Sequence, residues 1–265
     1  MKKFKKKYDI PTENLCFITK NFISTGLPMR AIDKNEFHRY NNRVSTCMLA
    51  PSDTGLPYGM IPRYAIVAIV TYIVRTDEQI MQIGSSNREH FSALGIKANT
   101  SGKIVKYKNQ QLNALLNCAF LVTKTDNNGD KKTIRFFIAK ENSIDRLENV
   151  QSITFSDEFY KYARDRNHVV PLDRYILAIF DRSPLCFDLY ITLAYRHYYM
   201  RQNQKYYELI TYDVLRKQLG LDFNRDADLK RQLRLAIQRI KIFLMMHVYL
   251  TDKGMALKCD YPVTK

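Results

Sequence analysis

Apolar residues follow a helical spacing in the stretch that begins near residue 61. They recur three and four positions apart, as on the buried face of a helix, at Ala65, Ile66, Ile69, Val70 and Ile73. The continuous apolar run covers only residues 64–74, whereas a membrane-spanning helix needs about twenty residues. We therefore expect a helix that packs into a protein core, and we reject a membrane anchor.

The segment "GLPYGMIPR" (Gly55–Arg63) leads into this helix. Pro62 suits the first helical turn, where its missing N–H costs nothing, and each proline restricts the residue before it to extended geometry. Gly59 permits a turn between the two prolines. The pattern predicts a stiff lead-in with Arg63 at the exposed start of the helix, where either a phosphate or a carboxylate is a suitable partner.

The patterns that follow, as far as residue 137, complete one module. In "SSNREHFSALGI", Ser85 or Ser86 is a suitable N-cap and Gly95 a suitable stop for a helix. Two β-rich runs flank Asn128–Gly129, which is a strong hairpin signal. Helix, short strand, helix, helix and hairpin is the order of a winged-helix module. After the first helix we expect a strand at 79–83, helices at 85–95 and 103–118, and a hairpin that turns at 128–129.

The second half of the chain repeats this order. Proline opens each of two expected helices, Thr211 is a suitable N-cap for a later one, and Gly220 is a suitable stop for it. We expect helices at 171–180, 184–200, 211–220 and 227–244, a short strand at "YELI" (207–210), and a hairpin that turns at 252–254.

This repetition predicts an α+β, mainly α, chain with two tandem winged-helix domains. Residues 1–55 read as irregular and form a basic N-terminal arm and leading segment. The first winged-helix domain covers residues 56–147 and the second covers residues 148–265, with the joint near 142–151.

Charge indicates the kind of partner. Lys and Arg number 42 against 26 Asp and Glu, for a formal net charge of +16, and the excess is spread over both halves. A polyanion that meets both halves would explain this balance, although a merely soluble basic protein is an alternative. The arm carries Lys2, Lys3, Lys5, Lys6 and Lys7, and it is either a solubilising tail or a phosphate-contacting arm.

The third helix of the second module has two unlike faces. One face is apolar, with Leu229, Leu233, Ala236, Ile237, Ile240 and Phe243. Arg and Gln read the edges of guanine and adenine, whereas Lys serves mostly as a charge for phosphate. We favour DNA contact for the polar face over an ordinary solvated surface, and we assign to it Arg225, Lys230, Arg231, Arg234, Gln238 and Lys241.

The first module has a comparable helix and a charged hairpin. On the helix, Lys103, Lys106, Gln110 and Asn113 follow three-and-four spacing, and Lys108 adds charge nearby. On the hairpin, cations would contact backbone phosphate and set affinity more than sequence choice, or they discourage strand aggregation at a sheet edge. These hairpin residues are Lys131, Lys132 and Arg135.

Catalytic and metal-binding patterns are missing from the sequence. "GIKANTSGKI" (Gly95–Ile104) has the wrong glycine spacing for a phosphate-binding loop, and Ile104 replaces the hydroxyl residue that holds Mg²⁺. The five histidines form no HxH pair and the five cysteines form no CxxC pair. We expect no catalytic residues, no cofactor and no metal site, and a reduced, cytosolic protein that is not an enzyme.

Several segments resemble the family of plasmid-encoded RepA-type replication initiators. The series begins with "LPMRAIDKNEFHRYNN", "GLPYGMIPR" and "IGSSNREHFSALGI", and continues with "FSDEFYKYA", "PLDRYILAIFDRSPLCFDLYITLAYR" and "YDVLRKQLG". In order, they cover roughly residues 22–257. The family often has a Gly-Gly pair before the first recognition helix, whereas this chain has Ser101–Gly102.

The resemblance implies a function. Such initiators bind repeated sites, usually iterons, in the double-stranded DNA of a plasmid origin, open adjacent A·T-rich DNA and recruit the host helicase and other replisome proteins. Related initiators often form homodimers that repress. The resemblance leaves two alternatives for this chain, a winged-helix transcriptional repressor without an initiation role and a rolling-circle nickase.

Overall fold

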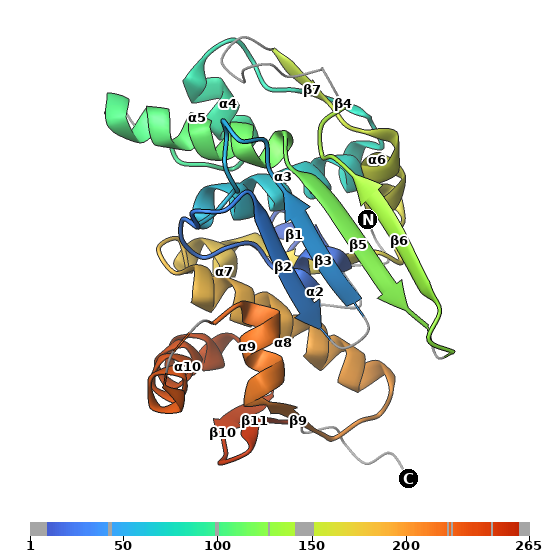
Figure 1. The fold of residues 1–265 in the computed structure, drawn as a ribbon, viewed down its shortest axis with the longest axis vertical. Helices are drawn as coiled ribbons and strands as arrows, with labels where there is room; N and C mark the ends of the chain where they lie inside the picture. Colours follow the sequence, from blue (N-terminus) through green and yellow to red (C-terminus); the bar gives the residue numbers. More distant parts are fainter. Residues whose placement is uncertain are drawn as a thin grey trace. The chain divides into compact units, whose positions relative to one another are not determined.

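Two compact units make up the chain, Met1–Arg174 and Tyr175–Lys265 (Figure 1). The lysines of the basic arm, and residues 142–150 of the expected joint, lie outside the part of the chain that is described. The fold class is mixed, with helices and strands in both units. The computed structural model describes residues 10–41, 44–98, 101–126, 128–140, 151–221, 223, 225–244 and 246–259.

An antiparallel sheet in the order β2-β3-β5-β6 forms one layer of the first unit (Figure 1). Because side chains alternate along a strand, neighbouring rows of the sheet face opposite sides. Met48, Phe120 and Phe136 share a row and are buried. His38, Cys47, Leu121 and Arg135 form the next row, on the more exposed outer face. The strands are β2 (Glu36–Asn41), β3 (Val44–Leu49), β5 (Ala119–Thr125) and β6 (Lys131–Phe136).

Helix α3 (Met60–Thr76) is the central helix of this unit, and it confirms the predicted apolar stripe. All five of the expected core residues from Ala65 to Ile73 are buried. The helix contacts β1 (Leu15–Thr19), α5 (Gly102–Leu116) and α6 (Asp157–Arg164). Burial on several sides explains why the helix is apolar over most of its length.

Two small strand pairs join segments that are far apart in the sequence. Strand β1 pairs with β8 (Val169–Asp173), and β4 (Ile80–Gln82) pairs with β7 (Ser152–Thr154). Both pairs are antiparallel and lie within the first unit. The unit therefore extends to Arg174, later than the boundary expected between residues 147 and 148.

The leading segment is regular, in contrast to the irregular structure expected for residues 1–55. It forms β1, α2 (Lys20–Thr25), β2 and β3. In β2 the polar Arg39 lies on the same side as Phe37 and is buried, so the alternation of apolar and polar residues that marks a strand is broken and "EFHRYN" reads like a loop. The helix expected at 171–180 is also shorter, because residues 171–173 belong to β8 and α7 (Arg174–Ile179) begins after them.

The short helix α4 (Asn87–Ala93) begins where the sequence predicts. Ser86 is its N-cap and accepts a hydrogen bond from the backbone N–H of Glu89 at 3.3 Å. The Glu89 carboxylate accepts in return from the backbone N–H of Ser86 at 3.0 Å, which completes a capping box. These bonds to the charged form lower the pKa of Glu89, with the backbone bond from Ser85 as the largest cause.

The second unit follows the predicted order closely. Its strands form one antiparallel sheet in the order β10-β11-β9 (Figure 1). Helix α10 contacts α8 and β10, and its buried residues include Leu229, Leu233 and Ile240. After α7 come α8 (Pro184–Gln202), β9 (Tyr207–Thr211), α9 (Tyr212–Leu219), α10 (Asp226–Ile240), the 3-10 turn Lys241–Phe243, β10 (His247–Leu250) and β11 (Gly254–Lys258).

Replacing Gly254 by alanine is expected to destabilise the second unit by about 1–3 kcal/mol. An added Cβ would lie 2.1 Å from the backbone oxygen of Ile210 and 2.8 Å from the Cα of Thr211. Both atoms belong to β9, which is hydrogen-bonded to β11, so the clash is relieved only by separating the two strands. Thermal unfolding followed by circular dichroism measures the loss. Gly102→Ala, where a Cβ meets nothing within 4 Å, is the control, and equal midpoints for the two variants would contradict the prediction.

No helix within the described residues combines the length and the apolar character that crossing a membrane requires.

Candidate nucleic-acid interface

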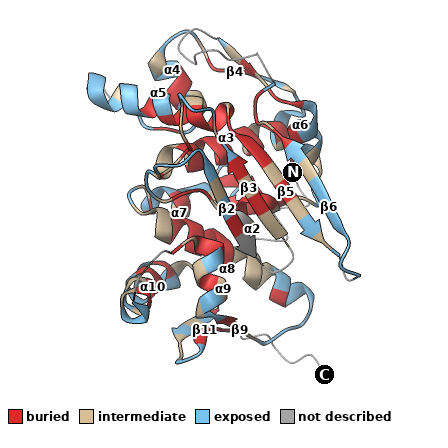
Figure 2. Ribbon diagram, in the orientation of Figure 1, coloured by how far each residue is buried: buried red, intermediate tan, exposed pale blue. Residues whose placement is uncertain are grey.

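Helix α10 has the two faces that the sequence predicts. Leu229, Leu233, Ala236, Ile237 and Ile240 are buried, whereas Arg231, Arg234, Gln238 and the following Lys241 are exposed. Figure 2 shows this division along the helix. The exposed side therefore presents guanidinium, amide and ammonium groups to the surroundings, the chemistry that contacts base edges and phosphates.

The remaining two candidates of this helix lie at its borders. Lys230 is half-buried, and its Nζ lies 5.0 Å from the centroid of the Tyr212 ring. Arg225 is exposed and is the N-cap residue. Arg231 pairs with Asp228 at 3.4 Å, but both side chains are largely exposed, and such a pair is weak. The Arg231 guanidinium can exchange this partner for a phosphate at little cost.

Arg216 of α9 fixes the point at which α10 begins. Its Nη1 donates to the backbone oxygen of Phe223 at 2.7 Å, and its Nη2 donates to the Asp226 carboxylate at 2.5 Å. Asp226 and Asp228 lie in the first turn of α10, where the helix dipole favours negative charge. The turn between the two helices is thereby held by one guanidinium.

Helix α9 is itself capped and tied to its neighbours. Thr211 accepts from the backbone N–H of Val214 at 3.4 Å, and Gly220 ends the helix with a left-handed φ of 59°. Arg196 of α8 forms an ion pair with Glu208 of β9 and donates to the buried Gln218 of α9 at 3.2 Å. One arginine thus connects α8, β9 and α9; of these, α8 contacts α10 directly and α9 is linked to it by the Arg216–Asp226 pair.

Helix α5 of the first unit carries a second exposed polar face. Lys103, Lys106 and Gln110 are exposed, and Asn113 is half-buried. Figure 2 shows one end of α5 coloured as exposed. Ser101 is the N-cap and the helix begins at Gly102. The first turn of the helix, which contains Lys103, is its most exposed part. Ile104 and Tyr107 are also exposed there, at 42% and 36%, which places apolar surface beside the cations.

Lys108 is the one predicted contact that the structure turns away from this face. The side chain is buried, its Nζ donates to the backbone oxygen of Lys97, and the ammonium lies 5.0 Å from the centroid of the Phe91 ring. Burial lowers the pKa of Lys108 because it disfavours the charged form. Lys108 is therefore not a surface charge available to DNA, as predicted, but a buried side chain that links α5 to the segment before it.

The hairpin cations are exposed but do not share one side. Lys131 and Arg135 lie on the outer face of the sheet, whereas Lys132 alternates to the opposite side, directly across from Lys124. Burial lowers the pKa of Lys124, and the charges of Lys20 and Lys132 add to the effect. Because β5 also pairs with β3, this hairpin is the edge of a four-stranded sheet and not a free-standing wing.

Arg63 lies inside the first unit, contrary to the exposed position expected at the start of α3. Its side chain is 3% exposed. Nη1 donates to the backbone oxygens of Gly59 at 2.6 Å and Pro28 at 3.1 Å, and Nη2 donates to that of Leu27 at 2.8 Å. The guanidinium therefore clamps the lead-in segment to residues 27–28, and it is removed from the candidate phosphate contacts.

A sequence model described as "Plasmid encoded RepA protein" matches residues 56–214, which is more than half of the chain. The chain belongs to this family of plasmid replication initiators. A comparison with curated protein sequences gives no match for this RepA-family protein.

Solved structures of another protein, RctB, share the fold of this chain. The selenomethionine form of domains 2 and 3 of RctB matches with a TM-score of 0.53 and 12% identity, over 91% of this chain and 98% of that one. A second structure of RctB domains 2–3 matches with a TM-score of 0.50 and 12% identity, over 90% and 97%. At this identity the likeness concerns the fold alone, and it extends over both units of the RepA-family chain.

The sequence patterns missed the residues that hold the candidate interface in place. Arg196 and Arg216 read as ordinary polar residues of amphipathic helices, since their partners Glu208 and Asp226 lie on other elements.

Leu235, 49% exposed, and Ile242, 74% exposed, lie among the cations of the α10 region. In the sequence, the one sign that these apolar residues share the cationic face is their spacing, four residues after Arg231 and Gln238 respectively. Apolar side chains in such positions are suited to contact the methyl groups of thymine.

Proposed function

We propose that this protein is a non-enzymatic, sequence-specific DNA-binding initiator of plasmid replication in the bacterial cytoplasm. It binds repeats of the iteron type in the origin, promotes opening of adjacent A·T-rich DNA, and recruits the host helicase or other replisome proteins. Membership of the RepA family supports the replication role. The homodimer that is common among related initiators belongs to the same proposal.

Two winged-helix modules are part of the proposal. In the second unit, the order α8, β9, α9, α10, β10, β11 and a sheet that joins β9 to the hairpin both support a winged helix. The first unit has the same order from α3 to β6, but β4 pairs with β7 and the hairpin extends into β3 and β2. This supports a modified module in which the short strand β4 pairs with β7 and not with the hairpin.

The observation that carries the proposal is the exposed cationic face of α10. A helix with one buried apolar side and a run of exposed Arg, Gln and Lys fits the major groove, which is about 12 Å wide. Its upstream neighbour α9 and the Arg216 contacts are suited to hold it there. Proteins of this kind use the same helix to select bases and to contact phosphate.

Replication in trans distinguishes an initiator from a repressor. A plasmid that carries only the upstream repeats and the A·T-rich stretch should replicate when the gene is supplied from a second molecule. Failure to replicate, with repression of a reporter retained, would favour the repressor. Incubation with supercoiled origin DNA and Mg²⁺ should leave no covalent protein–DNA adduct, and such an adduct would instead identify a nickase.

Arg234→Ala is expected to weaken binding to origin DNA by about 1–3 kcal/mol, with a smaller loss on random DNA, because an exposed arginine on α10 is suited to read guanine. Fluorescence anisotropy with matched specific and scrambled duplexes measures both losses. Arg201→Ala, at an exposed position in the last turn of α8, is the control and should change neither. Equal losses on the two duplexes would reduce Arg234 to a phosphate contact.

A further inference from the structure

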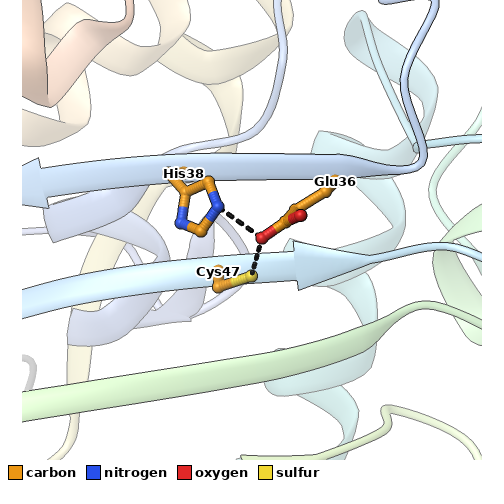
Figure 3. A group of neighbouring side chains, drawn as sticks. All are labelled: Glu36, His38 and Cys47. Carbon is orange, nitrogen blue, oxygen red and sulfur yellow. Dashed lines mark hydrogen bonds and ion pairs between the residues drawn. The ribbon is translucent and has the colours of Figure 1, made fainter.

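Three donor side chains converge on the outer face of the sheet in the first unit (Figure 3). The register places His38 of β2 directly opposite Cys47 of β3, and Glu36 lies two residues before His38 on the same side of its strand. The Glu36 Oε1 lies 2.5 Å from the His38 Nε2 and accepts from the Cys47 Sγ at 3.6 Å. The ligand atoms of the three residues all lie within 4.8 Å of one another.

The geometry points to a binding site for a divalent transition-metal ion of the zinc type, held by Glu36, His38 and Cys47. Thiolate, imidazole and carboxylate are the ligands that Zn²⁺ takes in proteins, and a thiolate selects against Mg²⁺ and Ca²⁺. Three protein ligands leave one tetrahedral position for water or another group. The inference does not depend on DNA binding.

The distances suit such an ion after small movements. With metal–sulfur bonds near 2.3 Å and bonds to nitrogen or oxygen near 2.0–2.2 Å, tetrahedral donors lie roughly 3.3–3.8 Å apart. The Glu36–His38 contact of 2.5 Å would lengthen, and the Cys47–Glu36 separation of 3.6 Å already lies in this range. The third pair, Cys47 and His38, lies within 4.8 Å, so rotations of the side chains can provide the remaining change. The backbone is already placed, because β2 and β3 are hydrogen-bonded along their length.

Access distinguishes Cys47 from the other cysteines. All five cysteines lie in the described part of the chain, and Cys16, Cys118, Cys186 and Cys259 are buried, whereas Cys47 is not. Glu36 and His38 are more than half exposed. An ion can therefore reach the site from solvent, and its charge would replace the thiol proton that Cys47 now donates to Glu36. Bound metal would join the edge strand β2 to β3 through side chains.

Cobalt(II) is the spectroscopic probe for the full-length, untagged protein. We expect a thiolate-to-cobalt charge-transfer band that saturates at one ion per chain and is displaced by zinc. Cys47→Ser should remove the band, and His38→Gln or Glu36→Gln should each lower the affinity at least about tenfold. His247→Gln changes an exposed histidine of the other unit and should leave the titration unchanged.

Two results with the variants would overturn the site. One is a band that persists in Cys47→Ser, and the other is an affinity that His38→Gln and Glu36→Gln leave unchanged. If Cys47→Ser fails to fold, the wild-type protein decides the matter, because zinc should slow the labelling of Cys47 by a thiol reagent as mapped by mass spectrometry. An unchanged labelling rate at saturating zinc overturns the proposal.

Discussion

Replacing Arg63 by leucine should destabilise the first unit by about 2–4 kcal/mol. The guanidinium donates three hydrogen bonds to the backbone oxygens of Leu27, Pro28 and Gly59, and the side chain is buried. Each hydrogen bond to a charged group contributes about 1.5–3 kcal/mol, and a buried acceptor left without its donor costs about 1–3 kcal/mol. Other donors also satisfy these acceptors in part, as the N–H of Gly59 does for the oxygen of Pro28. The expected loss of unfolding free energy is therefore smaller than the summed contribution of three hydrogen bonds.

Hydrogen exchange read by mass spectrometry locates this effect. Peptides from α3 should lose protection in Arg63→Leu, whereas peptides from α8 in the second unit serve as an internal reference. Arg63→Lys should fall between wild type and leucine, because one ammonium cannot reproduce the planar fork. Arg88→Leu, at an exposed site on α4, should have no effect. Unchanged protection of α3 in Arg63→Leu would show that the three carbonyls do not need the guanidinium.

Local signals in the sequence predicted the helices well. Ser85 or Ser86 was the predicted N-cap of α4, and the structure has Ser86 there; Thr211 with Gly220 marked both ends of α9. Each of these signals acts within a few residues, through a capping hydrogen bond or a left-handed turn. The two faces of α10 were predictable for the same reason, since a helix repeats every 3.6 residues and its period is visible in one short stretch.

Long-range pairing was beyond the reach of such patterns. The strands β1 and β8 are buried along nearly all of their length, so their apolar runs lack the alternation that marks a strand, and Pro171 reads as a helix start. The partners β4 and β7 are three residues each. The boundary between the units depends on these pairings, which explains why the sequence placed it too early.

The same limit applies to single side chains. Lys108 and Arg63 are polar residues of helices, and only the tertiary structure decides that each turns inward to backbone oxygens. Glu36, His38 and Cys47 match no metal-ligand spacing, because the register between β2 and β3 brings them together. Because residues 1–55 were predicted to be irregular, the pairing of β2 with β3 was not predicted, and neither was the cluster of side chains on it.

Salt should change the DNA affinity more than any single substitution. Each phosphate contact adds about −0.9 to the slope of log K against log salt, so six to ten contacts lower the affinity about 10³- to 10⁵-fold between 50 and 200 mM. The candidate cations that remain exposed or half-buried on α5, α10 and the hairpin are numerous enough for this. Anisotropy titrations at several salt concentrations give the slope, and a flat profile would contradict the assigned faces.

Removing three cations from α10 tests which surface produces that slope. In a variant with Lys230, Arg231 and Lys241 replaced by glutamine, the slope should fall by about three, one for each lost phosphate contact. A charge-matched variant at the exposed Lys34, Lys161 and Lys205 loses the same net charge elsewhere and should keep the wild-type slope. Counterion release is local to the contacted phosphates, so only the first variant should respond. If both variants lose slope equally, the net charge of the protein and not the face of α10 governs binding.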